Sequence, residues 1–358
     1  MTTEARIWPD VAIPPGETLA ETLKELELSQ AELARRTGRP VQAINEIVRG
    51  TKEITSDTAL QFEMVLGVPA HFWSRLEADY KLNKARLAEE VRLKKQVPLL
   101  SKYPFRNMAS RGWVDSVRDR VERVRELLRF FGVASLYDVE TTLPAAFRKC
   151  SKRHASPEAL AAWLRQGERE AQNIDAQPFS ESVLRGNLPE VRTLTTQSPQ
   201  VFEPRLKELL ASSGVALVLV PHLPKTYAHG AARWIRRGQT ALVQMSIRYK
   251  WDDIFWFSLF HELGHVLLHD RGQVFVEYDG ESADEREREA DEFATEQLIP
   301  TEAFTRFVAG RTLSQQAVLQ FSREQGIAAS IVVGRLQHDG RVPHSRFNRL
   351  RARFGRAP

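Results

Sequence analysis

The sequence contains a single cysteine, Cys150, among its 358 residues. One cysteine excludes a disulfide framework and a cysteine-rich metal site, and it is typical of a cytoplasmic protein. No apolar run approaches the ~20 residues that a membrane-spanning helix needs, and the longest, Ile254–Phe260, ends at His261. The N-terminus carries Glu4 and Asp10 where a signal peptide would have an apolar core. We therefore expect a cytoplasmic protein with no membrane contact.

Charge is unevenly distributed along the chain, although the formal net charge is only +5. Residues 1–80 hold eight Lys or Arg and 13 Asp or Glu, whereas residues 81–130 hold 14 and six. Residues 341–358 contain six arginines and no acidic residue. Such basic segments favour contact with phosphates or another acidic surface, but a solvated helix face or a frayed tail has the same composition.

Hydrophobic periodicity predicts a fold of the α+β class that is mostly helical. Five regions are expected: an all-α helix-turn-helix domain over 14–80, a helical connecting region over 81–175, a linker over 176–200, an α+β domain with a small sheet over 201–338, and a basic tail over 339–358. In the α+β domain, strands are predicted over Val215–Val220 and Thr240–Ser246, and helices over 252–269, 284–297 and 312–320.

A metal-binding pattern lies inside the first of these three helices. His261 and His265 enclose Glu262 in an H-E-x-x-H motif. Residues four apart lie on one face of a helix, so both imidazoles can reach one Zn²⁺. Glu262 can then act as the general base that accepts a proton from water and returns it to a leaving amine.

A hydrolytic zinc site needs a third protein ligand, and we expect a carboxylate from the next helix. The candidates are Glu281, Asp284, Glu285, Glu287, Glu289, Asp291 and Glu292. Helical spacing favours Glu287 as the ligand, with Asp291 one turn later accepting the Nδ1–H of a zinc-binding histidine. Glu289 remains the alternative ligand.

This part of the chain resembles the ImmA/IrrE family of metallopeptidases. The resemblance rests on residues 257–269, 287–294 and 298–300, and it covers roughly residues 200–300. It implies a zincin-like, thermolysin-type zinc peptidase whose third ligand is a Glu four residues before an Asn or Asp, which corresponds to Glu287 and Asp291. Members typically cleave a bound repressor, often one that controls stress, phage or mobile-element genes.

The sequence does not assign two further parts of a peptidase site, the groups that stabilise the intermediate and the strand that binds the substrate. The side chains that could stabilise a tetrahedral intermediate are Tyr227, His229, Tyr249, Tyr278 and His338. The predicted strand Thr240–Ser246 could bind an extended substrate by strand addition, or it could be an ordinary internal strand.

The N-terminal region has the form of a helix-turn-helix. A helix over residues 29–38 is followed by a second helix within residues 39–47, whose first residues would face a major groove. Gln42 and Asn45 can make bidentate contacts with adenine. Phosphate contacts are expected from Gln30, Arg39, Arg49 and Lys52.

These helices resemble the Cro/C1-type repressor fold and, more closely, the HigA-like antitoxins. The closer resemblance rests on residues 15–19, residues 54–60 and the pair Phe72-Trp73. It implies a domain that binds operator DNA, usually as a dimer. The acidic charge of the region and Glu46 in the recognition helix depart from the pattern, so a domain for dimerisation or partner docking is the alternative.

Together the motifs and the two resemblances imply a stress-responsive transcription regulator that binds operator DNA and holds one Zn²⁺ per chain. We expect it to cleave itself or a repressor-type partner protein. The alternative is a regulator or antitoxin whose zinc site is structural or sensory, for which a fourth ligand such as His269 would close the site. A third interpretation, a toxin–antitoxin component, predicts a small toxin encoded beside it.

Overall fold

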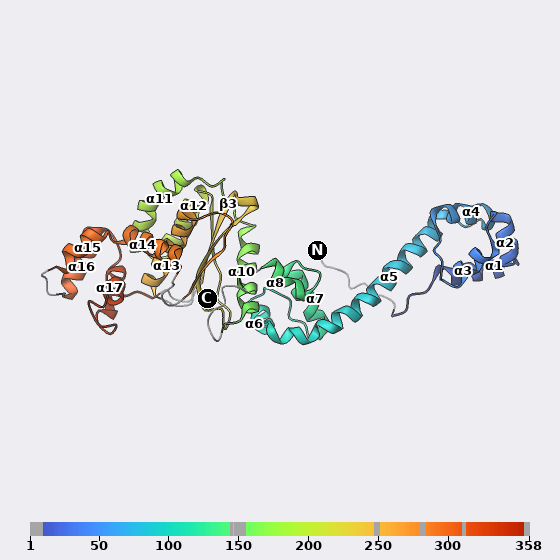
Figure 1. The fold of residues 1–358 in the computed structure, drawn as a ribbon, viewed down its shortest axis with the longest axis horizontal. Coiled ribbons are helices and arrows are strands. Elements are labelled where there is room, and N and C mark those ends of the chain that lie inside the picture. The colour runs from blue at the N-terminus through green and yellow to red at the C-terminus, as the bar shows by residue number, and fades with distance from the viewer. Residues whose placement is uncertain are drawn as a thin grey trace. The chain divides into compact units, whose positions relative to one another are not determined.

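The computed structural model describes residues 10–143, 146, 155–246, 251–278, 284–309 and 313–353. The predicted class is confirmed, because the fold is α+β and mostly helical (Figure 1). The chain divides into two units, Met1–Pro98 and Leu99–Pro358. None of the helices within the described ranges combines the length and the apolar character that a membrane crossing requires.

The N-terminal unit contains five α-helices among its described residues. They are α1 (Pro15–Glu25), α2 (Gln30–Thr37), α3 (Val41–Val48), α4 (Ser56–Leu66) and α5 (Ala70–Gln96). The Ser29 side chain caps α2, and Gly38, with a φ of 67°, ends it in the left-handed conformation that glycine adopts most readily. The boundary predicted at residue 80 falls inside α5, which is a continuous helix of 27 residues.

The C-terminal unit begins with further helices. They are η1 (Val97–Lys102), which starts in the first unit, α6 (Phe105–Ser110), α7 (Arg120–Phe131), η2 (Leu136–Asp138), α8 (Val139–Thr142), α10 (Pro157–Ala171), α11 (Glu181–Thr193), η3 (Leu194–Thr196) and α12 (Pro199–Ser212). The linker predicted over 176–200 is therefore wrong. Its polar residues include helix-terminal signals, since Ser180 caps α11 and Pro199 is the first residue of α12.

The sheet of this unit has the strand order β1-β3-β2-β4. The strands are β1 (Val215–Leu219), β2 (Ala228–Ile235), β3 (Thr240–Met245) and β4 (Phe275–Tyr278), with η4 (Arg236–Gly238) before β3. β1 and β3 are parallel, whereas β2 runs antiparallel to both β3 and β4. Strand addition to β3 is excluded because β3 is paired on both sides, and among the described strands β4 forms an edge.

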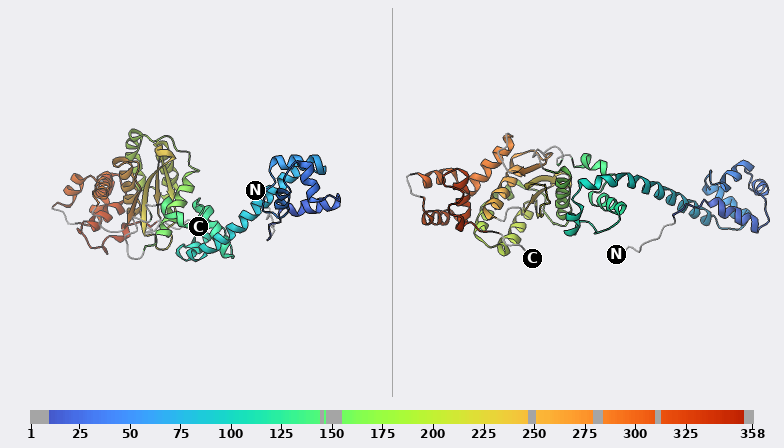
Figure 2. Two further views of the ribbon diagram at one scale, coloured as in Figure 1. Left: turned by 45° about the vertical axis from the view of Figure 1, so that its right-hand side comes forward. Right: turned by 90° about the horizontal axis from the view of Figure 1, so that it is seen from below.

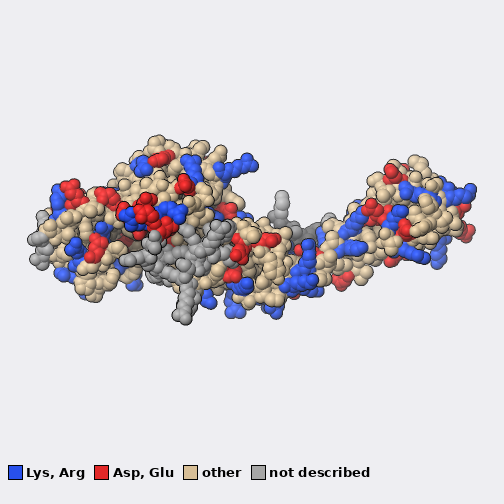
Figure 3. Space-filling view, in the orientation of Figure 1, with Lys and Arg blue, Asp and Glu red and all other residues tan. Residues whose placement is uncertain are grey.

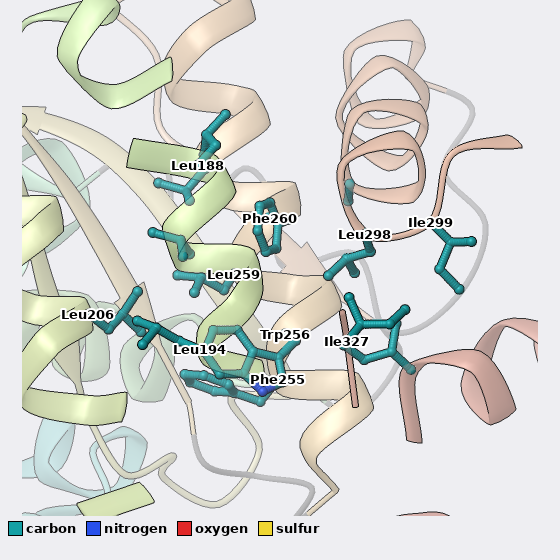
Figure 4. Packing of buried hydrophobic residues seen from close by; sticks show 14 of the residues in the cluster. Leu188, Leu194, Leu206, Phe255, Trp256, Leu259, Phe260, Leu298, Ile299 and Ile327 are labelled. Carbon is teal, nitrogen blue, oxygen red and sulfur yellow. The ribbon is translucent and has the colours of Figure 1, made fainter. Parts of the chain in front are cut away.

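Helices cover both faces of the sheet (Figure 2). On one face the Gln244 side chain donates a hydrogen bond to the carbonyl of Trp163 in α10. On the other face Val243 and Met245 join the main hydrophobic core, which includes residues of α13 (Asp252–Leu268). In Figure 4, Leu188 of α11, Phe260 of α13 and other side chains from separate helices meet in this core.

The remaining helices follow α13. They are α14 (Glu285–Leu298), α15 (Thr301–Val308), α16 (Gln315–Gln325), α17 (Ala329–His338) and η5 (Asn348–Leu350). As far as residue 353, the basic tail is docked, because Arg351 forms an ion pair with Asp253 at 2.8 Å. The guanidinium groups of Arg351 and Arg353 also lie over the ring of Trp251, 4.5 Å and 4.1 Å from its centroid. The tail therefore packs against the first residues of α13 and the residue before them.

Candidate functional site

The site lies where α13 and α14 pack against each other. Gly264, inside the H-E-x-x-H motif, allows a close approach of the two helices. A Cβ atom at this position would lie 3.2 Å from the Cα of Ala290 and 3.1 Å from Cδ1 of Phe293. The absence of a side chain therefore brings the acidic face of α14 within reach of the two motif histidines.

Three predicted ligand side chains converge at this contact. His261 Nε2 and His265 Nε2 lie 2.9 Å apart, and Glu287 Oε2 lies 3.2 Å and 3.3 Å from them. In a tetrahedral site with zinc–ligand bonds of ~2.0–2.1 Å, neighbouring ligand atoms lie about 3.3 Å apart. The donor set and its spacing therefore fit a zinc-sized ion, and the three residues form a cluster that could hold one.

The protonation of the cluster reflects its hydrogen bonds. Burial alone would lower the pKa of His261, but hydrogen bonds with Asp291 and Glu287 raise this pKa to about 11. Burial lowers the pKa of His265 to about 4. Burial would raise the pKa of Glu287, but hydrogen bonds from the two histidines hold this pKa far below its usual range. These hydrogen bonds therefore favour a protonated His261 and a charged Glu287.

Each histidine has a partner at Nδ1. His261 Nδ1 lies 2.7 Å from Oδ1 of Asp291, the residue one turn after Glu287. His265 Nδ1 lies 3.0 Å from Nδ1 of His269, whose Nε2 lies 3.0 Å from Glu289 Oε2. Glu289 contacts His269 instead of the cluster, so its position does not fit the alternative third ligand.

Glu262 lies in the most buried part of the site. Its side chain is inaccessible to solvent, with 0% exposure. It faces Gly230 of β2, where an added Cβ atom would lie 2.5 Å from Glu262 Oε1. The strand must therefore have a glycine here for the carboxylate to occupy its position.

Strand β4 contributes two side chains that the sequence did not indicate. Phe275 stacks on His265, with ring centroids 4.1 Å apart and an interplanar angle of 11°. Glu277 accepts a hydrogen bond from Ser258 of α13 at 2.9 Å. A four-residue strand without clear alternation gave no signal that its side chains would face the motif helix.

Most of the other candidate acids are engaged elsewhere. Glu285 and Glu292 form ion pairs with Arg288, and Asp284 pairs with Arg286. Glu281 lies outside the described residues.

The candidate donors for a tetrahedral intermediate are only partly placed. His338 lies at the surface and hydrogen-bonds to its neighbour Asp339, whereas His229 is buried in β2. Tyr227 precedes β2 and has a φ of 54°. Tyr249 and the side chain of Tyr278 lie outside the described residues.

The expected DNA-contacting residues lie on α2, α3 and the segments that flank α3. Gln42 and Arg49 are exposed, while Gln30 and Asn45 are partly exposed. Gln42 donates a hydrogen bond to Glu46 at 3.0 Å, and Lys52 lies 3.6 Å from the same carboxylate. Arg39, partly buried, hydrogen-bonds to Gln61 of α4.

Comparison with known families confirms the resemblance to the ImmA/IrrE family and the helix-turn-helix form of the N-terminal region. A family model described as the IrrE N-terminal-like domain matches residues 253–333, which include His261, His265 and Glu287. A second model, described as helix-turn-helix, matches residues 19–73. The chain thus combines a peptidase-family domain with a helix-turn-helix domain.

Individual relatives match shorter parts of the chain. The virulence-associated protein I of Dichelobacter nodosus is 41% identical over 75 residues, which are 21% of this chain and 69% of that protein. An addiction module antidote protein of the HigA family from Coxiella burnetii is 32% identical, with a TM-score of 0.23, over 24% of this chain and 94% of its own. The Pseudomonas aeruginosa antitoxin HigA, solved with the higBA promoter, is also 32% identical, with a TM-score of 0.23, over 24% of this chain and 95% of its own.

Proposed function

Because the chain belongs to the family of the virulence-associated protein I and also carries an IrrE N-terminal-like domain, we propose that it is a DNA-binding regulator with a zinc-dependent endopeptidase domain. The observation that carries the peptidase proposal is the convergence of three ligand atoms with separations of 2.9–3.3 Å. Such a set leaves the fourth tetrahedral position for water or substrate, as hydrolytic zinc sites require.

The protein residues divide the work of peptide hydrolysis among them. His261, His265 and Glu287 would hold the metal, which when bound lowers the pKa of water and polarises a carbonyl. Glu262 would accept the proton of the attacking water and return it to the leaving amine. Asp291 accepts a hydrogen bond from Nδ1–H of His261, so Nε2 is the ring nitrogen that would supply its lone pair to a bound metal ion.

The substrate of this site would be an extended segment of a repressor-type protein or of the chain itself. β4 is an edge strand among those described, and Phe275 and Glu277 of β4 contact the motif helix. A segment paired with the outer edge of β4 would place a peptide bond close to the cluster, with main-chain hydrogen bonds providing affinity.

The helix-turn-helix domain would bind operator DNA through α3. Gln42 and Asn45 would contact base edges, while Gln30, Arg39, Arg49 and Lys52 would contact phosphates. Basic side chains also gather along α5 in the face shown in Figure 3, and Lys84 and Lys95 lie on this helix. They would add phosphate contacts beyond those of α3.

Metal analysis combined with a cleavage assay tests the peptidase proposal. We expect one zinc per chain in the wild type and its loss in Glu287→Ala. Glu292→Ala is the matched control on the same helix, since Glu292 pairs with Arg288 at the surface. Cleavage of co-expressed candidate repressors should be abolished in Glu262→Gln, which keeps the three ligands.

A second candidate function is a sensor or antitoxin whose zinc is not catalytic. Zinc retained without cleavage of any candidate repressor would favour it. The absence of zinc from purified wild-type protein after incubation with zinc would contradict both functions.

A further inference from the structure

The two histidines of the cluster have different partners at Nδ1. His261 contacts the carboxylate of Asp291 directly. His265 instead contacts His269, which in turn contacts Glu289. The His269 side chain is only 4% exposed, whereas Glu289 is 45% exposed. The proposed metal site assigns no role to His269 or Glu289.

The chemistry of these groups determines where the protons lie. A carboxylate only accepts hydrogen bonds, so Nε2 of His269 carries the hydrogen that it donates to Glu289. In a neutral imidazole the other nitrogen is then an acceptor, so Nδ1 of His269 accepts a hydrogen bond from Nδ1–H of His265. The lone pair of His265 is consequently on Nε2, the atom that lies 2.9 Å from His261 Nε2.

We propose that Glu289 and His269 form a relay that orients His265 for metal binding, and that His269 is a positioning residue and not a ligand. This inference rests on the metal site of the proposed function. Phe275 fixes the plane of the His265 ring by stacking on it at 4.1 Å. The relay also determines which ring nitrogen of His265 carries the hydrogen, and therefore which one presents its lone pair to the cluster.

The same contacts leave His269 without a ring nitrogen directed to the cluster, so it is not placed as a fourth ligand. Its Nδ1 faces Nδ1 of His265, the nitrogen on the far side of the ring from the converging Nε2 atom. Its Nε2 is directed to Glu289 at the surface. Both ring nitrogens of His269 are thus engaged away from the cluster, which leaves the fourth position open.

Zinc affinity of the full-length protein, measured by competition with a chromogenic chelator, tests the relay. His269→Phe keeps a ring of similar size next to Phe275 but removes the acceptor, and it should weaken zinc binding about 10- to 100-fold. In His269→Asn the amide oxygen can take the place of Nδ1, so affinity should stay within about threefold of wild type. A purely structural role would not produce this rescue, because asparagine fills the cavity less well than phenylalanine.

Two further measurements separate orientation from folding. The visible spectrum of the Co²⁺-loaded protein should change in His269→Phe and stay like that of the wild type in His269→Asn. Glu289→Ala, a surface change that does not threaten the core, should weaken zinc binding, while Glu292→Ala should not. Equal zinc affinity and cobalt spectra in wild type and His269→Phe would overturn the relay alone. A wild-type protein that binds no zinc would instead overturn the proposed metal site.

Discussion

Gly230→Ala is the substitution for which the structure makes the sharpest prediction about catalysis. The added Cβ atom would lie 2.5 Å from Glu262 Oε1, 2.8 Å from Cγ and 3.0 Å from Cδ, whereas ordinary van der Waals contact begins near 3.4 Å. The carboxylate cannot move into solvent, since Glu262 is fully buried. It must therefore move within the site by about 1 Å, a displacement that typically costs ~10²-fold in rate.

The other properties of this variant should change little. Overpacking of this kind costs about 1–3 kcal/mol of folding stability. Gly230 pairs with Met245 of β3 and is not among the glycines with a positive φ, so its backbone conformation is open to alanine. The metal ligands lie on α13 and α14, so zinc content should remain at one per chain. We therefore expect about a hundredfold slower cleavage with zinc retained.

The assay compares the rate of cleavage of a candidate repressor, zinc content and Tm in wild type and three variants. Glu262→Gln sets the rate without a general base. Gly186→Ala is the matched glycine control, since Gly186 lies on α11 with nothing within 4 Å of an added Cβ atom. The reasoning would be refuted by Gly230→Ala cleaving at the wild-type rate while Glu262→Gln is inactive, because the packing of Gly230 against Glu262 would then be irrelevant.

Three other predictions concern the helix contact, the tail and DNA. Gly264→Ala should push α14 away from α13 and weaken zinc binding about tenfold, with a loss of about 1–3 kcal/mol in the stability of the metal-free protein; unchanged affinity in chelator competition would contradict this. Arg351→Ala should cost about 3 kcal/mol in urea unfolding at neutral pH because it leaves Asp253 buried without its partner. Burial already raises the pKa of Asp253, and loss of Arg351 raises this pKa further. The loss in free energy of unfolding should therefore shrink as pH falls through this pKa, because the carboxyl is then protonated and needs no partner. A loss that grows on acidification would contradict this reasoning. Lys52→Ala should reduce the slope of log K against log salt for DNA binding by about 0.9, and an unchanged slope would remove Lys52 from the phosphate contacts.

The sequence predicted those parts of the site that depend on spacing within one helix. The i, i+4 relation placed His261 and His265 together, and the same relation between Glu287 and Asp291 placed both beside His261. Helical spacing alone favoured Glu287 but left Glu289 open. The structure separates them because His269, which ends α13, lies next to Glu289.

The sequence could not predict contacts that depend on how separate elements pack. Gly230 is an ordinary glycine in sequence, and its role appears only when β2 lies against Glu262. The prediction of a linker over 176–200 was wrong for a similar reason, because these residues combine helix caps with a buried helical face. Leu184, Leu188 and Val191 of that face are recognisable as core only once the strands that they pack near are known.

The organisation of the candidate site follows from one buried helix. Most of the 17 residues of α13 are buried, and Trp256, Leu259 and Phe260 belong to the main core. The packing that stabilises the unit therefore also orders His261 and His265, in contrast to zinc fingers, where metal binding and folding are one event. Metal affinity and folding stability should then be separable in this protein. The element to which the site is most sensitive is α14, since it supplies Glu287, Asp291 and Glu289 through a contact that depends on Gly264 having no side chain.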